Sequence, residues 1–312
     1  MNGPFSKPTE RPTVIYIAGW GRSGSTILDR ILGQTDGVAS LGELSLLWER
    51  GVARNEYCGC GQPFNDCDFW TRVGERAFGR WDAVSPERIR WLRRIVARPY
   101  HQLLPRVTRR RREGERELAS YLNHVYCAVA EVAEVRTLVD SSKQPVVARI
   151  LARNSIDIRV LHLIRDPRGV AYSWSKDVLR VDATGGTGDR MQKFSAFASG
   201  FRWVVVNVLA LRLSSQVPYV AIRYEDLVRN PREALRTINA CLDLQLPLEG
   251  LVGPENEVML GVNHTVAGNP SRLLTGPTLL KEDAQWRTSL PRRDRRLISL
   301  LTAPLRMRFD YR

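Results

Sequence analysis

Residues 19–26 read GWGRSGST, and they lie between an apolar run at 14–18 (VIYIA) and the segment 27–32 (ILDRIL). The β-branched and aromatic residues of 14–18 predict a buried strand, and the apolar spacing predicts a helix over 25–34 that ends near Gly33. A glycine-rich turn between a strand and a helix gathers backbone N–H groups and the positive end of the helix dipole around one point. The stretch therefore predicts an anion-binding loop in an α/β fold.

This loop has the glycine and threonine spacing of the phosphate-binding pattern G-x-x-x-x-G-K-[ST], but a serine stands where the pattern has its lysine. An arginine inside the turn supplies the positive charge instead. The glycines allow the backbone to curl, and the serine and threonine hydroxyls add hydrogen-bond donors. The residues expected to bind the anion are Gly21, Arg22, Ser23, Gly24, Ser25 and Thr26.

The rest of the chain alternates between predicted strands and helices. Short apolar strands are predicted at 137–140, 160–164 and 219–224, and helices at 145–153, 167–178, 193–213, 231–242 and 291–303. A second helix is predicted to begin within 41–48, and 57–70 and 250–285 are rich in turn-forming residues. This order predicts a three-layer α/β sandwich, a mostly parallel sheet with helices on both faces, whose ligand binds at the carboxyl ends of the strands.

The chain of 312 residues carries a net charge of +14, which favours an anionic ligand, polymer or surface as a partner. Much of the charge lies in a basic helical region over 88–116, where four arginines at 109–112 precede Glu113, Glu115 and Glu117. This spacing favours a solvated helix with i,i+4 charge pairs, and a polyanion-binding module is the less favoured reading. Aromatic residues do not interleave with the basic ones, so we expect no specific nucleic-acid binding.

Five cysteines and a polar N-terminal segment bear on the compartment and on metal binding. No secretory signal or transmembrane segment is recognisable, and an odd, small number of cysteines is untypical of a disulfide scaffold, so we expect a cytoplasmic protein.

Cys58, Cys60 and Cys67 could supply three zinc ligands, but the spacing is loose and no fourth ligand is obvious. Local packing or a redox-sensitive pair is the favoured role, and we expect no metal.

Three motifs together resemble one enzyme family. The strand with GRSGST resembles the 5′-phosphosulfate loop of sulfotransferases that use 3′-phosphoadenosine 5′-phosphosulfate (PAPS), in particular the carbohydrate and tyrosylprotein types. The segment 163–173, LIRDPRGVAYS, looks like the family's 3′-phosphate motif, with Arg165 at a strand end and Ser173 two helical turns beyond Pro167. The segment 223–227, RYEDL, is similar to the family segment whose tyrosine, here Tyr224, lies beside the nucleotide.

The resemblance implies a reaction and roles for particular residues. It implies in-line transfer of sulfate from PAPS to an acceptor hydroxyl, with 3′,5′-adenosine diphosphate as the product and no metal. Glu43 matches the family's base, and Lys143 matches a lysine near the leaving phosphosulfate, whose charge Arg22 would share. Ser271 and Arg272 stand roughly where cytosolic members close a loop over the 3′-phosphate. His162, within an apolar strand, is expected to be a core residue rather than a base.

The resemblance also sets expectations for the domain and for partners. We expect residues 1–312 to form one domain, with 50–135 as a loop-rich and helical insertion that shapes the acceptor site. The acceptor is expected to be a small molecule or glycan, but no residue identifies it, and the oligomeric state is equally open.

A nucleotide-dependent small-molecule kinase is the second hypothesis. It rests on the loop and on Asp140, which follows a predicted strand and could hold Mg²⁺. The missing loop lysine argues against it.

Overall fold

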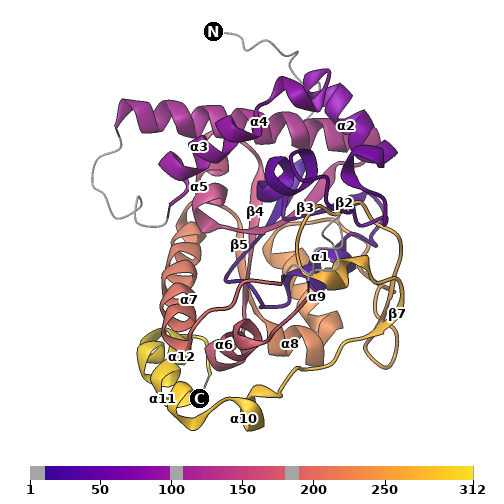
Figure 1. The fold of residues 1–312 in the computed structure, drawn as a ribbon. Helices are drawn as coiled ribbons and strands as arrows, with labels where there is room; N and C mark the ends of the chain where they lie inside the picture. Colours follow the sequence, from indigo (N-terminus) through magenta and orange to yellow (C-terminus); the bar gives the residue numbers. More distant parts are fainter. Residues whose placement is uncertain (1–10, 99–107, 180–189, 312) are drawn as a thin grey trace.

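The computed structural model describes residues 11–98, 108–179 and 190–311, and its centre is a five-stranded parallel sheet. The strand order is β2-β3-β1-β4-β5. The strands are β1 (Thr13–Ala18), β2 (Val38–Gly42), β3 (Thr137–Lys143), β4 (Ile158–Ile164) and β5 (Tyr219–Arg223). Helices cover both faces of this sheet (Figure 1), so the predicted fold class is confirmed.

Alternate residues of β1 point into two separate cores, as the pleat of a strand requires. Val14, Tyr16 and Ala18 belong to the larger core, and Ile15 and Ile17 belong to the second. Every residue from Val14 to Ala18 is fully buried, which is why the strand reads as a continuous apolar run instead of an alternating one. The helices that bury the second core are α1 (Ser25–Leu32), α8 (Tyr224–Arg229) and α9 (Pro231–Cys241).

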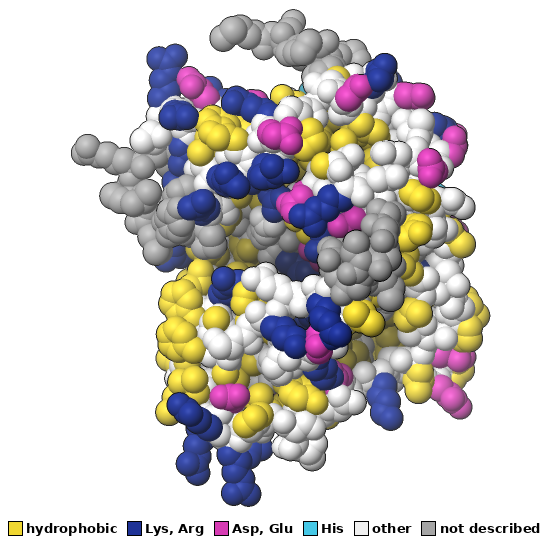
Figure 2. All heavy atoms as spheres, viewed as in Figure 1, with side chains coloured by type: hydrophobic (Ala, Val, Ile, Leu, Met, Phe, Trp, Pro, Cys, Tyr) yellow, Lys and Arg dark blue, Asp and Glu magenta, His cyan; other side chains and the backbone are white. Residues whose placement is uncertain are grey.

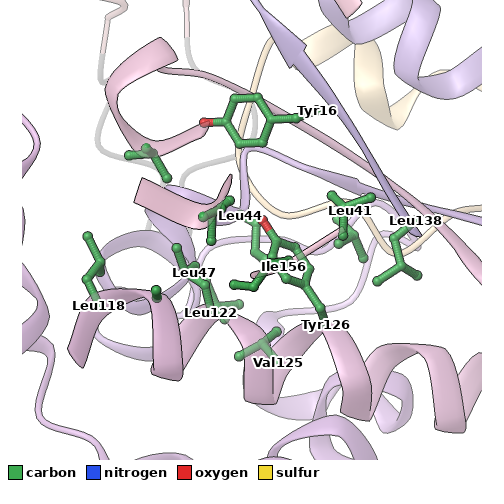
Figure 3. Close-up of a cluster of buried hydrophobic side chains, with 14 of the residues drawn as sticks. Tyr16, Leu41, Leu44, Leu47, Leu118, Leu122, Val125, Tyr126, Leu138 and Ile156 are labelled. Carbon is green, nitrogen blue, oxygen red and sulfur yellow. The ribbon is translucent and has the colours of Figure 1, made fainter. Parts of the chain in front are cut away.

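The larger core is covered by helices that include most of the region 50–135. Figure 3 shows Leu118, Leu122 and Val125 on one side of a helix, close to Leu44 and Leu47. The helices of this core are α2 (Asp68–Phe78), α3 (Pro86–Val96), α4 (Arg109–Ala133), α5 (Pro145–Arg153) and α7 (Ala196–Leu211).

The basic run at the start of α4 forms the expected charge pairs along the helix. Arg109 Nε lies 2.9 Å from Glu113 Oε1, and Arg111 Nε lies 3.2 Å from Glu115 Oε1. Both are i,i+4 pairs, so the predicted charge pairing is confirmed. The first pair is exposed, as expected for a solvated helix, but Arg111 and Glu115 are buried, so that part of the prediction is wrong for the second pair.

The segment after α1 differs from its prediction. Residues 38–42 form β2, which pairs in parallel with β3, and a 3₁₀ turn (Leu44–Leu46) and a π-helical turn (Leu47–Val52) follow in place of a regular helix. Gly42 ends the strand with a φ of +71°, and a side chain there would meet the backbone of Val266. Strand pairing has therefore overridden local helix preference, and it fixes the position of Glu43 at the end of an edge strand.

The chain returns to this edge near its C-terminal end. A hairpin of β6 (Glu257–Leu260) and β7 (Gly276–Leu279) brackets a loop, and Val266 in that loop forms a parallel bridge with Gly42. Arg30 of α1 holds the loop by donating to the carbonyls of Arg272 (2.5 Å), Leu274 (3.0 Å) and Gly261 (2.6 Å). The helices that follow are α10 (Trp286–Ser289), α11 (Arg292–Leu301) and α12 (Ala303–Arg308).

Helix α7 and its following turn, Ala196–Ser215, are long and apolar enough to cross a membrane by length and composition alone. In this fold the helix lies between α6 (Pro167–Ser175) and α11, and Trp203, Asn207 and Ala210 are buried. Only 39% of the apolar window is buried in this fold, and Phe197 and Phe201 are exposed. Figure 2 shows hydrophobic side chains along the edge that α7 occupies and a band of Lys and Arg side chains across the middle of the same face.

Candidate functional site

A cavity of about 600 Å³ lies at the carboxyl ends of the strands, where the parallel fold places ligands. Its wall combines the loop after β1, Glu43 after β2, the end of β3, Arg165 after β4 and Tyr224 after β5. Residues far apart in sequence therefore share one space. Of the predicted site residues, those that line it are Gly21, Arg22, Gly24, Ser25, Thr26, Glu43, Lys143, Arg165, Ser173, Tyr224 and Ser271.

The glycine-rich loop is shaped by close packing. Gly24 has a φ of +85°, and a Cβ there would lie 2.6 Å from Cδ2 of Tyr224, so only glycine fits between the loop and that ring. Ser23 is only 2% exposed and its hydroxyl donates to the carbonyl of Trp20 (2.8 Å), so it braces the loop and does not face the cavity. Helix α1 has no side-chain cap, which leaves its first amide groups available for an anion.

Arg22 lies at the centre of the loop in a left-handed conformation, with φ of +70°. Such backbone costs a non-glycine residue on the order of 1 kcal/mol and is found where geometry serves a site. Its guanidinium lies 5.0 Å from the ring centre of Trp174, and Nη2 donates to the sulfur of Met191 (3.0 Å). Nε is buried and has no hydrogen-bond partner among the described residues. Burial lowers the pKa of Arg22, but an arginine remains charged near neutral pH.

Glu43 and Lys143 face each other across two neighbouring strands. Lys143 Nζ donates to Oε1 of Glu43 at 2.6 Å and to the carbonyl of Ser141 at 3.2 Å. Lys143 is also left-handed, with φ of +65°, and the β1–β3 register shifts beside it. Both side chains are partly buried, at 14% exposure for lysine and 21% for glutamate.

Arg165 is held by a network at the opposite side of the loop. Its Nη1 donates to the carbonyl of Arg22 (3.0 Å), Nη2 donates to the carbonyl of Asp283 (2.9 Å), and Nη2 also lies 3.2 Å from the Asp283 carboxylate. The guanidinium lies 4.5 Å from the ring centre of Tyr224. Burial raises the pKa of Asp283, but Arg165, Lys176 and the backbone amide of Gln285 together outweigh it and hold that pKa below its ordinary value. The Asp283 carboxylate therefore already takes up one of the guanidinium nitrogens that Arg165 could offer to a ligand.

Arg272 does not reach the cavity, contrary to what its sequence position suggested. It is 1% exposed, and its guanidinium donates to the carbonyls of Thr265 (2.8 Å) and Tyr57. These contacts tie the loop before β7 to residue 57, so the position of Arg272 is that of a structural anchor. Ser271, its neighbour, does line the cavity.

Two other polar residues from the sequence analysis lie in the core. Asp140 is 1% exposed, and its carboxylate accepts hydrogen bonds from Tyr126 (2.6 Å) and from the Ser142 amide (2.8 Å) and hydroxyl (2.5 Å). His162 is fully buried between Tyr219 (2.6 Å) and Asn207 (2.7 Å), and burial lowers its pKa to about 4. The expectation that His162 is a satisfied core residue is confirmed.

The sequence analysis missed an aromatic wall of the cavity. Trp20, Trp174 and Phe194 pack together, with ring centres 5.5 Å apart for the two tryptophans and 4.8 Å for Trp174 and Phe194. Arg202 lies 4.2 Å from the ring centre of Phe194. The position of Trp20 inside the glycine-rich loop could have indicated an aromatic side chain at the site. Nothing in the sequence places Phe194 beside it. Within 50–135, Ala97 is the one lining residue among those the structure describes.

Comparisons with known proteins identify the family and the fold. A model of the sulfotransferase family matches residues 12–247. A sulfotransferase domain from the olefin synthase of Synechococcus PCC 7002 is similar in structure, with 22% identity, a TM-score of 0.52 and coverage of 96% of this chain and 98% of that one.

A sulfotransferase domain from the curacin biosynthetic pathway is similar at 19% identity and a TM-score of 0.51, with coverage of 94% and 99%. These structural matches show the fold, and none of the curated proteins searched matches the sequence. The family model covers well over half of the chain. The chain therefore belongs to the sulfotransferase family.

Proposed function

We propose that this sulfotransferase moves the sulfuryl group from PAPS to a hydroxyl of a small-molecule or glycan acceptor. The observation that carries the proposal is the convergence of an anion-binding loop, a second cationic site and a carboxylate on one cavity of about 600 Å³. A volume of this size lies within the range of ordinary ligand sites, and it leaves room for a nucleotide and part of an acceptor.

The donor fits two separate anion sites. The amides at the start of α1, with Ser25, Thr26 and the Arg22 guanidinium, would hold the 5′-phosphosulfate. Arg165 and Ser173 would hold the 3′-phosphate, because an arginine fork matches a phosphate bidentately.

Glu43 would act as the general base. Its Oε1 is held by Lys143, whereas Oε2 accepts no hydrogen bond from residues 11–98, 108–179 or 190–311 and is available to an acceptor hydroxyl. As the acceptor oxygen bonds to sulfur and the bond from sulfur to the 5′-phosphate oxygen breaks, Glu43 takes the hydroxyl proton. Lys143 and Arg22 would stabilise the negative charge that develops on the leaving phosphate.

The kinase hypothesis loses support from the structure. Asp140, its candidate magnesium ligand, is buried and accepts hydrogen bonds from Tyr126 and Ser142, and it does not line the cavity. Ser25 also leaves the loop without its usual lysine. A cytoplasmic location goes with the proposal, because none of the five cysteines, all of which the structure describes, forms a disulfide, as expected in a reducing compartment.

Labelled sulfate tests the proposal directly. The purified full chain is incubated with PAPS labelled in the sulfuryl group and a panel of sugar, phenol and alcohol acceptors, without ATP. We expect the wild type to transfer labelled sulfate to at least one acceptor, and we expect the Glu43→Ala variant to lose this transfer. Transfer that requires ATP and Mg²⁺, or phosphate transfer in place of sulfate, would overturn the proposal in favour of a kinase.

A further inference from the structure

A cluster of three cysteines and one histidine lies outside the cavity. Its members are Cys58, Cys60, Cys67 and His264, and their sulfur and nitrogen atoms all lie within 4.8 Å of one another. The first three come from the loop before α2, and His264 comes from the loop between β6 and β7, about 200 positions later in the sequence. The fold therefore supplies the fourth ligand that the spacing of the cysteines did not reveal.

Four of the six separations among these atoms lie close to the edges of a tetrahedron around a zinc ion, and the other two are no longer than 4.8 Å. Sγ of Cys67 lies 3.6 Å from Sγ of Cys58 and 3.7 Å from Sγ of Cys60. Nδ1 of His264 lies 3.3 Å from Sγ of Cys67 and 3.7 Å from Sγ of Cys58. Zinc bonds of about 2.3 Å to sulfur and about 2.0–2.1 Å to nitrogen give tetrahedral edges of about 3.8 Å and about 3.6 Å. A disulfide would instead bring two sulfurs to about 2.05 Å.

The surrounding backbone shapes the cluster. The amide of Cys58 donates to the carbonyl of Gln62 (2.7 Å), and the amide of Gly61 donates back to the carbonyl of Cys58 (2.9 Å), so the first two cysteines lie on one tight turn. Gly61 has a φ of +86°, which this turn requires. At Gly59 a Cβ would lie 1.9 Å from Oδ1 of Asn263, so the turn also packs directly against the loop that carries the histidine.

The histidine is oriented by its neighbours on α2. The ring of Phe69 stacks on the ring of His264, with centres 4.5 Å apart and planes 14° apart. Nε1 of Trp70 donates to the carbonyl of His264 at 2.8 Å. The ring and the backbone of His264 are thus both held with Nδ1 toward the sulfurs.

We propose that Cys58, Cys60, Cys67 and His264 form a structural zinc site. Three thiolates and one imidazole are a known ligand set for Zn²⁺, and soft thiolates favour zinc over the hard cations Mg²⁺ and Ca²⁺. When the ion binds, the three thiols release their protons to solvent. Four protein ligands complete the tetrahedron and leave no position for substrate, so the site is structural and has no direct part in sulfate transfer.

The zinc site joins the region 50–135 to the loop that borders the active-site cavity. Two residues after His264, Val266 accepts a hydrogen bond from the amide of Glu43 (2.9 Å), and its own amide donates to the carbonyl of Leu41 (2.9 Å). Gly268 and Ser271 of the same loop line the cavity. The zinc ion would therefore hold the loop between β6 and β7 in place. Through Val266, this loop in turn holds the backbone of Glu43.

Metal analysis of the purified full chain tests this proposal without any activity assay. Protein is produced in zinc-supplemented medium, dialysed, and measured by plasma mass spectrometry. We expect one zinc ion per chain, lost in Cys67→Ser and in His264→Ala. The matched controls, Cys241→Ser and His124→Ala, change a cysteine and a histidine outside the cluster and keep the zinc.

Two further measurements keep the proposal falsifiable if these variants do not fold. His264→Cys supplies a fourth thiolate, and we expect it to fold and retain one zinc ion. In the wild type, all five cysteines should titrate as thiols after denaturation in the presence of a chelator. The proposal would be overturned if the purified protein contained no zinc and also took up none from one added equivalent under reducing conditions. A count of three thiols would overturn it as well, because it would indicate a disulfide.

Discussion

Lys143 Nζ donates a 2.6 Å hydrogen bond to Oε1 of Glu43 between the ends of two neighbouring parallel strands, β3 and β2. The pair stands at the cavity where Arg22 also enters. This hydrogen bond orients the proposed base, and in the proposed mechanism the same lysine also stabilises the leaving phosphate. Charge of both signs is needed in sulfuryl transfer, because a proton is removed at one end while negative charge develops at the other.

Glu43→Gln should abolish most of the sulfate transfer. The amide keeps the size of the side chain but cannot take a proton, so kcat should fall by about 10²- to 10⁴-fold. Affinity for 3′,5′-adenosine diphosphate should not fall, since Glu43 is assigned to the acceptor and its neutralisation leaves Lys143 free to contact the 5′-phosphate. Initial-rate kinetics together with calorimetry check both, and Glu113→Gln, which changes an exposed glutamate of α4, is the control. Full activity in the Glu43 variant would remove it from the role of base.

Arg22→Gly should separate stability from function. Glycine adopts the φ of +70° without strain, which offsets the lost stacking on Trp174, so the free energy of unfolding should stay within about 1 kcal/mol of the wild type. Nucleotide affinity should nevertheless fall by about 10-fold or more, because a charged contact to the 5′ group is lost. Urea unfolding and calorimetry measure the two effects. An unchanged affinity would show that Arg22 does not contact the ligand.

Asp283→Asn should strengthen nucleotide binding. The carboxylate lies 3.2 Å from Nη2 of Arg165 and would repel a phosphate that binds the same guanidinium. Removing its charge should lower the Kd for 3′,5′-adenosine diphosphate by about 3- to 10-fold. The Kd for AMP, which lacks the 3′-phosphate, should change less. Weaker binding of both nucleotides would instead indicate that Asp283 positions Arg165 productively.

His162 should make the protein less stable as the pH falls. Its pKa is about 4 in the folded state against an ordinary value of 6.5, so the unfolded chain binds an extra proton between these values. Wild type should therefore lose about 3 kcal/mol relative to His162→Gln between pH 7 and pH 4. Denaturant unfolding across this range checks the difference. Parallel curves for the two proteins would show that the ring is not held neutral.

The sequence alone predicts the parts of the site that depend on local pattern. The loop between β1 and α1, the position of Arg165 after β4 and the position of Tyr224 after β5 each follow a strand end, and parallel strands bring such ends together. Glu43 and Lys143 also reach the cavity, although β2 was not anticipated. Their placement was expected only from the resemblance to the sulfotransferase family, because neither residue carries a local pattern of its own.

Contacts between distant segments could not be predicted in this way. Arg272 reads as a ligand contact, but its partners are carbonyl groups of residues 265 and 57, and backbone carbonyls carry no sequence signature. Asp283 and Phe194 reach the cavity from loops without strand-end patterns. His264 joins the three cysteines across about 200 residues, a distance over which spacing rules carry no information.

The central claim, that the cavity binds a nucleotide with both a 5′ and a 3′ anionic group, is tested most directly by calorimetry. The full chain is titrated with 3′,5′-adenosine diphosphate and with AMP, alongside Arg165→Ala. We predict that the wild type binds 3′,5′-adenosine diphosphate about 10- to 100-fold more tightly than AMP, and that Arg165→Ala removes this preference. Equal affinity of the wild type for the two nucleotides, or no binding of either, would contradict the account.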